Sequence, residues 1–367
     1  MKFMRRRIFQ ILKWSILLLI VYVGGFLLYG TLTDWQPPEQ MDLADINISD
    51  RGTERLIADS SLTFLIWNMG FAGLGEKAHF FYDKGDFFWT ELGEARAEQE
   101  EVEQSLKGVS TTIGAIAADF YLLQEVDTAS RRSFYTQQLD SILAKRANYG
   151  VHFAMNFKNN RVPLPIFQPW DHYGYVRSGL LSMSPYSAKE AERLSLPGKL
   201  SWPTRLFSLD RCVLRQRFAT QWGKDLVVYN VHLSAYDDGS KKAAEMAWLQ
   251  TQLQQDYADG NYVVVGGDWN QVPPGFDYAQ FTPLRRDDFF QFDIPFDYLP
   301  QGWKWVYDPA TPSNRKTPTP YDDQRSAKTL IDFYLISPNI RVEKVQCLDQ
   351  DFQFSDHQAV RVELRLQ

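Results

Sequence analysis

The chain has 367 residues, of which 44% are hydrophobic and 15% aromatic, enough to build a sizeable apolar core. This composition excludes an intrinsically disordered protein, and the length suits either one large α/β domain or two average ones. A formal net charge of −6 argues against a dedicated duplex-DNA binder, because sequence-independent affinity for nucleic acid comes mainly from Lys and Arg.

The N-terminal segment is predicted to cross a membrane. Trp14 to Thr33 contain no charged side chain, and about 20 helical residues span a bilayer. The basic residues of this end all precede the span: Lys2, Arg5, Arg6, Arg7 and Lys13. The positive-inside rule therefore places the N-terminus in the cytoplasm and the rest of the chain outside it. A cleaved signal peptide is the alternative, but bulky Leu27, Leu28 and Tyr29 stand where a small-residue cleavage site would be expected, which favours an uncleaved anchor.

Three regions are expected along the chain. Residues 1–33 form the cytoplasmic basic tip and the anchor. Residues 34–60 are polar, contain a Pro pair and lack a clear period, which indicates a linker or a stretch lying on the domain. Residues 61–367 form the folded domain. Its two cysteines, Cys212 and Cys347, lie in apolar runs and are interpreted as buried thiols, with a single disulfide as the alternative.

Strands are predicted in short apolar runs, and helices where charged and apolar residues alternate with helical spacing. The predicted strands cover residues 62–68, 119–127, 178–184, 205–218, 225–234, 261–270, 329–337, 341–348 and 357–366. The predicted helices cover residues 93–119, 131–146 and 240–257. Strands that are apolar throughout imply burial on both faces, and consecutive strands without a helix imply antiparallel pairing. This order favours a mixed α/β sandwich.

Polar side chains recur at the carboxyl ends of the predicted strands: Asn68, Gln124, Glu125, Asn230, His232, Asp268 and Asn270. A single residue of this kind most often caps a loop or an Asx turn. Their repetition favours a site, because the edge of a sheet can aim several side chains into one crevice. Asp356 and His357 follow in a turn just before the last predicted strand.

Six short motifs occur in order along the chain: WN at 67–68, LLQEVD at 122–127, NVHLS at 230–234, GGDWN at 266–270, LID at 330–332 and SDH at 355–357. Together they resemble the endonuclease/exonuclease/phosphatase superfamily over residues 61–367, and the chain is similar to its exported bacterial members of unassigned substrate. The resemblance implies an α/β fold, a DNase I-like four-layer sandwich of two mixed β-sheets flanked by helices, here preceded by the transmembrane helix.

The resemblance also implies metal-assisted phosphoester hydrolysis. Glu125, helped by Asn68 and Asp356, would hold Mg²⁺, a hard cation suited to carboxylate and amide oxygens, with Mn²⁺ as the alternative ion. Gly70 stands two residues after Asn68, where some nuclease members carry an acid. No second metal ligand is therefore expected from that position.

The implied catalytic residues are Asp268, Asn270, His232, Asp332 and His357. Asp268 would orient and deprotonate the attacking water, and Asn270 would fix the geometry. His357, aligned by Asp332, and His232 would donate hydrogen bonds to the nonbridging phosphate oxygens. Such preorganised donors stabilise the transition state more than the substrate.

Three further residues are predicted to contact substrate: His172, Asn230 and Arg177. His172 is placed on a loop approaching the site, with a surface imidazole as the alternative. Arg177 and Arg211 are candidate phosphate ligands, and a paired surface guanidinium is the alternative for each.

The sequence therefore predicts a Mg²⁺-dependent phosphodiesterase or phosphatase that acts outside the cytoplasm and meets the membrane through its N-terminal helix. The acidic balance, the tether and two aromatic-rich loops at residues 78–89 and 292–309 favour a phospholipid headgroup or a small phosphoester over duplex DNA. An extracytoplasmic nuclease is the enzymatic alternative, and a catalytically silent binding module on the same fold is a remote one. No obligate protein partner is expected.

Overall fold

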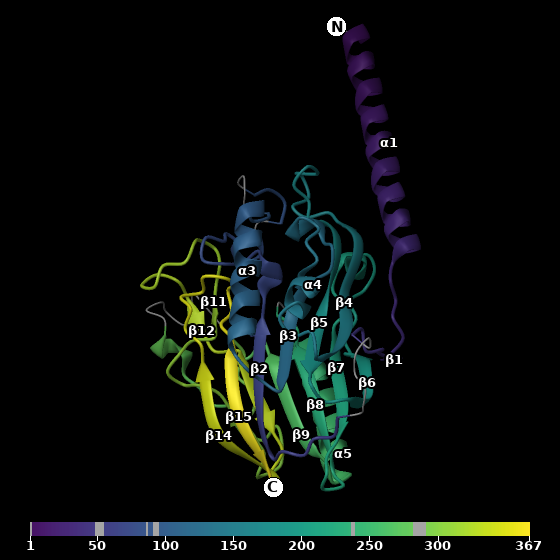
Figure 1. Ribbon diagram of the computed structural model, residues 1–367. Helices are drawn as coiled ribbons and strands as arrows, with labels where there is room; N and C mark the ends of the chain where they lie inside the picture. The colour runs from purple at the N-terminus through teal and green to yellow at the C-terminus, as the bar shows by residue number, and fades with distance from the viewer. Residues whose placement is uncertain (1, 48–54, 86, 91–94, 236–238, 282–290) are drawn as a thin grey trace.

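The computed structural model describes residues 2–47, 55–85, 87–90, 95–235, 239–281 and 291–367. Two mixed β-sheets pack face to face, and helices cover their outer faces (Figure 1). The seven-stranded sheet has the order β1 (Gln40–Asp42), β6 (Ala188–Ser195), β7 (Cys212–Ala219), β8 (Asp225–His232), β9 (Tyr262–Asp268), β13 (Asp332–Ile336) and β10 (Lys304–Val306). The six-stranded sheet has the order β14 (Ile340–Cys347), β15 (Val360–Leu366), β2 (Ser61–Asn68), β3 (Phe120–Asp127), β5 (Gly174–Ser184) and β4 (Gly150–Val162).

The remaining elements connect or cover these sheets. A separate two-stranded ribbon joins β11 (Asn314–Arg315) to β12 (Lys328–Thr329). The α-helices are α1 (Lys2–Thr33), α2 (Phe81–Lys84), α3 (Gln99–Ala115), α4 (Gln138–Leu143) and α5 (Ser240–Ala258). Single turns of 3-10 helix are η2 (Gly70–Ala72), η3 (Arg131–Ser133), η4 (Thr204–Phe207) and η5 (Tyr278–Gln280).

Each sheet contains one β-α-β unit that places two parallel strands side by side. In the six-stranded sheet β2 and β3 are parallel and are joined through α3, whereas in the seven-stranded sheet β8 and β9 are parallel and are joined through α5. The buried face of α3 recurs at steps of three and four residues: Val102, Leu106, Val109 and Ile113. Because parallel strands end at the same edge, each unit delivers two carboxyl ends to one edge of its sheet.

The core between the sheets comes from residues that alternate along the strands. Phe64 and Ile66 of β2 meet Val228 of β8 and Val264 of β9 in one buried cluster. Since successive side chains of a strand point to opposite faces, the even-numbered residues of these strands face the opposite sheet. The predicted four-layer sandwich of two mixed sheets flanked by helices is thus confirmed.

The segment between α1 and β2 contributes to the domain where it is described. β1 pairs antiparallel with β6 at the edge of the seven-stranded sheet. Ile57 is fully buried, and its N–H donates to the carbonyl of Ala219. The two cysteines, Cys212 and Cys347, are buried free thiols, as expected.

Two predicted elements differ from the structure. The helix predicted over residues 131–146 is interrupted, because Phe134 and Tyr135 adopt positive φ angles of 54° and 58° between η3 and α4. The strand predicted over residues 205–218 begins only at Cys212, and η4 precedes it. In both places side chains bind outside their own segment: Arg132 pairs with Asp127, and the ring of Phe207 packs on the N-terminal helix.

Phe64→Ala tests the core between the sheets. Phe64 is fully buried and stacks on Phe120 at a ring-centroid distance of 4.5 Å. Its truncation should lower the free energy of unfolding by about 3–5 kcal/mol, since it removes apolar burial and leaves a cavity. Urea unfolding in mild detergent measures this loss. Leu56→Ala, at a residue 47% exposed, is the control and should change little; equal small effects would contradict the described core.

Candidate active site

The inter-sheet core ends in a polar rim. Asn68 ends β2, His232 ends β8 and Asp268 ends β9, and all three continue the even-numbered, inward-facing rows of the core. Asn68 pairs with Gln124 across the parallel β2 and β3 ladder, and His232 pairs with Asp268 across β8 and β9. The two sheets therefore present their polar strand ends to each other.

Glu125 reaches this rim through an irregularity in β3. Its odd number would place the side chain on the outer face of the sheet. The pairing of β3 with β5 shifts register between Leu123 and Val126, and Glu125 itself has a φ of 53°. Such a bulge re-aims a side chain, and here it turns the carboxylate of Glu125 into the space between the sheets.

The rim encloses a cavity of about 270 Å³. Six predicted site residues line it: Glu125, His232, Asp268, Asn270, Asp356 and His357. Asn68 and Asp332 are buried beside these residues. Asn68 forms hydrogen bonds with Glu125 and Asp268, and Asp332 forms one with His357. The sequence motifs at six separate places thus meet at one cavity.

Asn68 links carboxylates that come from the two sheets. Its Nδ2 lies 2.9 Å from Oδ2 of Asp268 and 3.3 Å from Oε1 of Glu125, and its Oδ1 accepts from the N–H of Gly70 at 3.0 Å. Asp268 is also held through Oδ1, which accepts from the N–H of Asn270 at 2.9 Å. Asn270 in turn donates from Nδ2 to the carbonyl of Leu233. Each acid therefore has a defined orientation.

His357 is paired with a buried aspartate. Its Nδ1 lies 2.8 Å from Oδ2 of Asp332, which also accepts from the hydroxyl of Ser313 at 2.8 Å. Burial lowers the pKa of His357, but Asp332, Asp356 and Asp268 outweigh it and raise the pKa to about 10. These carboxylates therefore favour the positively charged form of the imidazole.

The surroundings of His232 favour the neutral imidazole instead. Its Nε2 lies 3.6 Å from Oδ2 of Asp268 and 3.8 Å from Oε1 of Glu125. Burial, followed by the positive charges of Arg211 and His357, lowers the pKa of His232 well below its usual range. The surroundings of the two imidazoles thus favour different charge states, neutral for His232 and positive for His357.

The carboxylates of the rim have too few positive partners. Burial raises the pKa of Asp356 to about 7, and nearby Glu125 adds to this effect. Among the described residues, no Lys or Arg forms an ion pair with Glu125, Asp268 or Asp356. A divalent cation would offset this negative charge, and carboxylate oxygens are the donors that such hard ions prefer.

A second group of possible metal donors overlaps the rim. One ligand atom each from Asp268, Asp332 and His357 lie within 4.8 Å of one another. A positive imidazole has no lone pair to offer a metal, so His357 is a poor ligand in that charge state. The chemistry of the donors therefore favours the predicted ligands Glu125 and Asp356 over this group.

Gly70 lies against the rim, and a side chain there would collide with it. Its φ is +50°, and a Cβ would lie 2.8 Å from Oδ1 of Asp356. An acid at position 70 would therefore displace Asp356 and strain the backbone.

The three predicted substrate contacts lie away from the lining of the cavity. Asn230 shares the inward face of β8 with His232 but sits two residues deeper, where Gln124 Nε2 donates to it at 2.7 Å. His172 is buried beside the carbonyl of Ile166. The guanidinium of Arg177 donates to the carbonyl of Asn159 at 2.9 Å. Each side chain is held by a neighbouring backbone or side-chain group, and none of the three lines the cavity.

Other residues of the cavity wall were not predicted, apart from Arg211. Asn314 lies 3.0 Å from Nε2 of His357 through its side-chain amide, and Arg315 and Lys316 follow it in the lining. These residues belong to β11 and the loop after it. No apolar run precedes them, so the sequence pattern does not predict a strand there. Arg211 lines the cavity and donates to the carbonyl of His232 at 3.1 Å.

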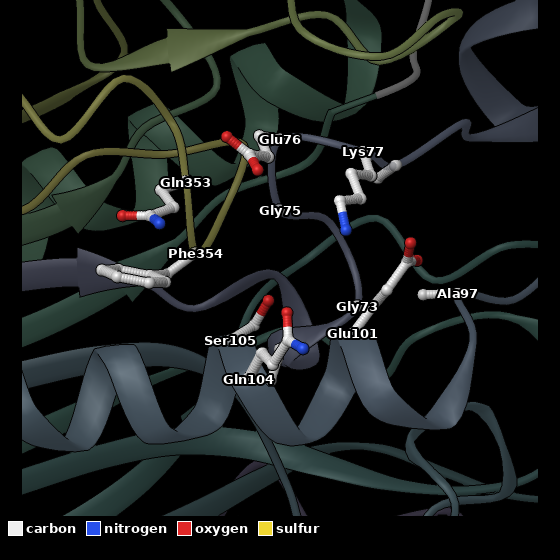
Figure 2. A pocket seen from close by; sticks show the side chains of 12 residues that line it. Gly73, Gly75, Glu76, Lys77, Ala97, Glu101, Gln104, Ser105, Gln353 and Phe354 are labelled. Atoms are coloured by element: carbon white, nitrogen blue, oxygen red, sulfur yellow. The ribbon is translucent and has the colours of Figure 1, made fainter.

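A second hollow lies between α3 and the loop that precedes Ser355. Figure 2 shows Glu101 and Gln104 of α3 on one side and Gln353 and Phe354 on the other. Its volume of about 70 Å³ is about a quarter of the 270 Å³ of the larger cavity. The larger cavity, with its acids and imidazoles, is therefore the candidate active site.

Comparison with known proteins agrees with this geometry. The profile of the Endonuclease/Exonuclease/phosphatase family matches residues 65–357. No curated protein matches the chain by sequence.

Solved structures share the fold at low sequence identity. An endonuclease/exonuclease/phosphatase from Beutenbergia cavernae DSM 12333 is 19% identical with a TM-score of 0.51, covering 83% of this chain and 72% of that one. A family protein from Leptotrichia buccalis C-1013-b is 15% identical with a TM-score of 0.51, covering 83% and 100%. ANGEL2, described as a 2',3'-cyclic phosphatase, is 15% identical with a TM-score of 0.50, covering 90% and 99%.

The profile match spans well over half of the chain and includes the cavity residues from Asn68 to His357. The chain therefore belongs to the Endonuclease/Exonuclease/phosphatase family, whose members are phosphoester hydrolases.

Proposed function

We propose that this protein is a Mg²⁺-dependent phosphoester hydrolase, a phosphodiesterase or a phosphatase, held at a membrane by α1 with its active site outside the cytoplasm. The observation that carries the proposal is the meeting of Glu125, Asp268 and Asp356 with a neutral and a positive imidazole around one cavity. Family membership and the ANGEL2 description support the phosphoester as the bond attacked.

The metal would be held by Glu125 and Asp356, with Asn68 beside them. For Asn68 to act as a ligand, its amide must turn so that the oxygen, which now accepts from Gly70, faces the ion. When bound, the ion polarises a phosphoryl oxygen and neutralises charge that builds there. Mg²⁺ suits the all-oxygen donor set, and Mn²⁺ is the alternative.

The remaining residues would act on the water and the phosphate. Asp268, held by Asn68 and Asn270, accepts a proton from the attacking water. The positive imidazole of His357 faces the cavity, where it stabilises the negative charge that grows on the phosphate. His232 is neutral, so it contributes a hydrogen bond rather than a charge.

The N-terminal helix would tether this site. α1 is long and apolar enough over Phe3 to Thr33 to cross a membrane, and its central window is not buried against the domain. Basic residues precede the apolar span, which favours a cytoplasmic N-terminus. A signal sequence passes the same test of length and composition, and sequencing the N-terminus of the membrane-bound protein distinguishes the two.

Metal removal and Glu125→Gln test the proposed metal site. The full chain in detergent should hydrolyse bis(p-nitrophenyl) phosphate only when Mg²⁺ is present and should lose this activity in EDTA. Glu125→Gln should raise the Mg²⁺ concentration for half-maximal rate by at least about tenfold, because it removes a charged ligand. Exposed Glu103→Gln is the control. Activity that persists in EDTA, or an unchanged Mg²⁺ requirement in Glu125→Gln, would contradict the proposal.

His357→Ala tests the role of the positive imidazole. The substitution should lower kcat by about 10²- to 10⁴-fold, because it removes a group that stabilises charge in the transition state. Steady-state kinetics with the same ester measure the effect. His79→Ala, at an exposed histidine outside the cavity lining, should leave kcat unchanged. Equal rates for the two variants would show that His357 is not catalytic.

Asp332→Asn tests the origin of that positive charge. Its carboxylate is the largest of the contributions that raise the pKa of His357, so the amide should lower this pKa by about one to three pH units. The histidine NMR titration of the metal-free protein measures it, with the signal assigned through His357→Gln. Exposed Asp259→Asn is the control. An unchanged pKa in Asp332→Asn would refute this electrostatic account.

A further inference from the structure

Residues 200–209, which include η4 and are called the η4 segment here, pack the N-terminal helix against the domain. The rings of Phe26 in α1 and Phe207 in η4 stack at 5.5 Å. Trp202 Nε1 donates to Thr31 Oγ1 at 3.1 Å, and Arg205 lies 3.5 Å from the carboxylate of Asp34. Where α1 leaves the domain, its last turns are therefore packed on this segment.

The same segment forms an apolar wall of the active-site cavity. Leu200, Phe207 and Leu209 line the cavity together with the acids and imidazoles. Phe207 thus touches the N-terminal helix and the active site at once. Since Phe26 lies seven residues before Thr33, this contact is about 10 Å along the helix from its end. A bilayer that contains α1 up to Thr33 would therefore reach the wall of the cavity.

Exposed aromatic rings gather on two neighbouring loops. The N–H groups of Ile166 and Phe167 donate to the carbonyls of Phe87 and Phe88, each at 3.0 Å. Four rings form pairs across these loops and are each 58–63% exposed: Phe88 with Phe167, and Trp89 with Trp170. We call these four side chains the aromatic patch. No other described segment of the chain buries these four side chains.

The aromatic patch lies on the side of the domain from which α1 projects. β4 contacts α1 and ends at Val162, and its continuation carries Phe167 and Trp170. Figure 1 shows α1 and the loop between β4 and β5 projecting from the same end of the domain. Trp202, which is 53% exposed, stands beside α1 in the η4 segment, and Leu200, which is 43% exposed, lies two residues before it.

We infer that the aromatic patch and the η4 segment rest in the surface of the bilayer that holds α1, and that the substrate is a phospholipid of that bilayer. This inference rests on the proposed function. Aromatic rings are most favourable at the boundary between headgroups and acyl chains. Arg161, which is exposed and lines a small hollow against α1, suits anionic headgroups. The apolar wall then faces the lipid body, and the acids and imidazoles face its phosphate.

The reaction balances with water alone. The water oxygen bonds to the lipid phosphorus, one phosphorus–oxygen ester bond breaks, and the departing alkoxide takes a proton to leave as an alcohol. No oxidant or further reactant is required. A substrate held at the bilayer surface also needs no diffusion through water, which accords with a tethered enzyme.

A fluorescent probe tests the surface without relying on turnover. Phe167→Cys and Trp222→Cys are labelled with an environment-sensitive dye in the full chain, where both native cysteines are buried. Trp222 is 42% exposed in the turn before β8, at the opposite end from His232. In vesicles of phosphatidylethanolamine and phosphatidylglycerol containing nitroxide-labelled lipid, the dye at position 167 should be quenched and the dye at 222 should not. Equal quenching at both positions overturns the surface.

Turnover tests the lipid assignment. Phosphorus NMR should show Mg²⁺-dependent loss of vesicle phospholipid, and Phe167→Ser combined with Trp170→Ser should slow it by about tenfold or more, because burial of two aromatic rings is lost. The same variant should hydrolyse bis(p-nitrophenyl) phosphate normally, and Trp222→Ser should match the wild type with both substrates.

The possible failures are distinct. Hydrolysis of the soluble ester without loss of lipid overturns the lipid assignment and leaves the proposed function standing. If the protein hydrolyses neither the soluble ester nor the lipid, the proposed function and the lipid assignment are both overturned. The dye quenching then tests only whether the aromatic patch rests in the bilayer surface. Nicking of plasmid DNA in preference to lipid would overturn the lipid assignment in favour of a nuclease.

Discussion

The packing of two inward-facing rows of side chains is the constraint on which the rest of this structure depends. Phe64 and Ile66 on one sheet meet Val228 and Val264 on the other, and the same rows continue beyond the core into polar residues. Where the apolar pairs end, acids and imidazoles must face each other across the same gap. Asn68 then ties the two sides together, because one amide group reaches carboxylates from both sheets. Core and active site are thus successive parts of one interface.

Electrostatics gives the two imidazoles of this interface different roles. His357 is surrounded by three carboxylates, which raise its pKa despite burial. Burial, followed by the nearby charges of Arg211 and His357, lowers the pKa of His232. Residues of one type thereby supply a positive charge and a neutral hydrogen-bonding group within one cavity. The excess of carboxylates over positive partners is what makes the site suited to a divalent cation.

Much of the fold could be predicted because its strands are long apolar runs with polar ends. β2, β8 and β9 lie within two residues of the predicted limits, and α5 lies within one. The helix predicted over 131–146 failed because Arg132 is drawn to a buried acid, a contact that local periodicity does not record. Asn230, His172 and Arg177 were placed near substrate by their positions in the sequence, yet neighbouring backbone and side chains occupy them.

The sequence by itself determined the fold class, the family and the identity of six site residues of the cavity, because strand periodicity and the motifs from Asn68 to His357 are local properties of the chain. Only the tertiary structure decided which way Glu125 points, which imidazole is charged and which aromatic loops stand beside α1. These depend on a register shift in β3, on carboxylates brought from distant segments and on the contact of η4 with the helix. Such properties arise from distances across the folded molecule, and no spacing along the chain encodes them directly.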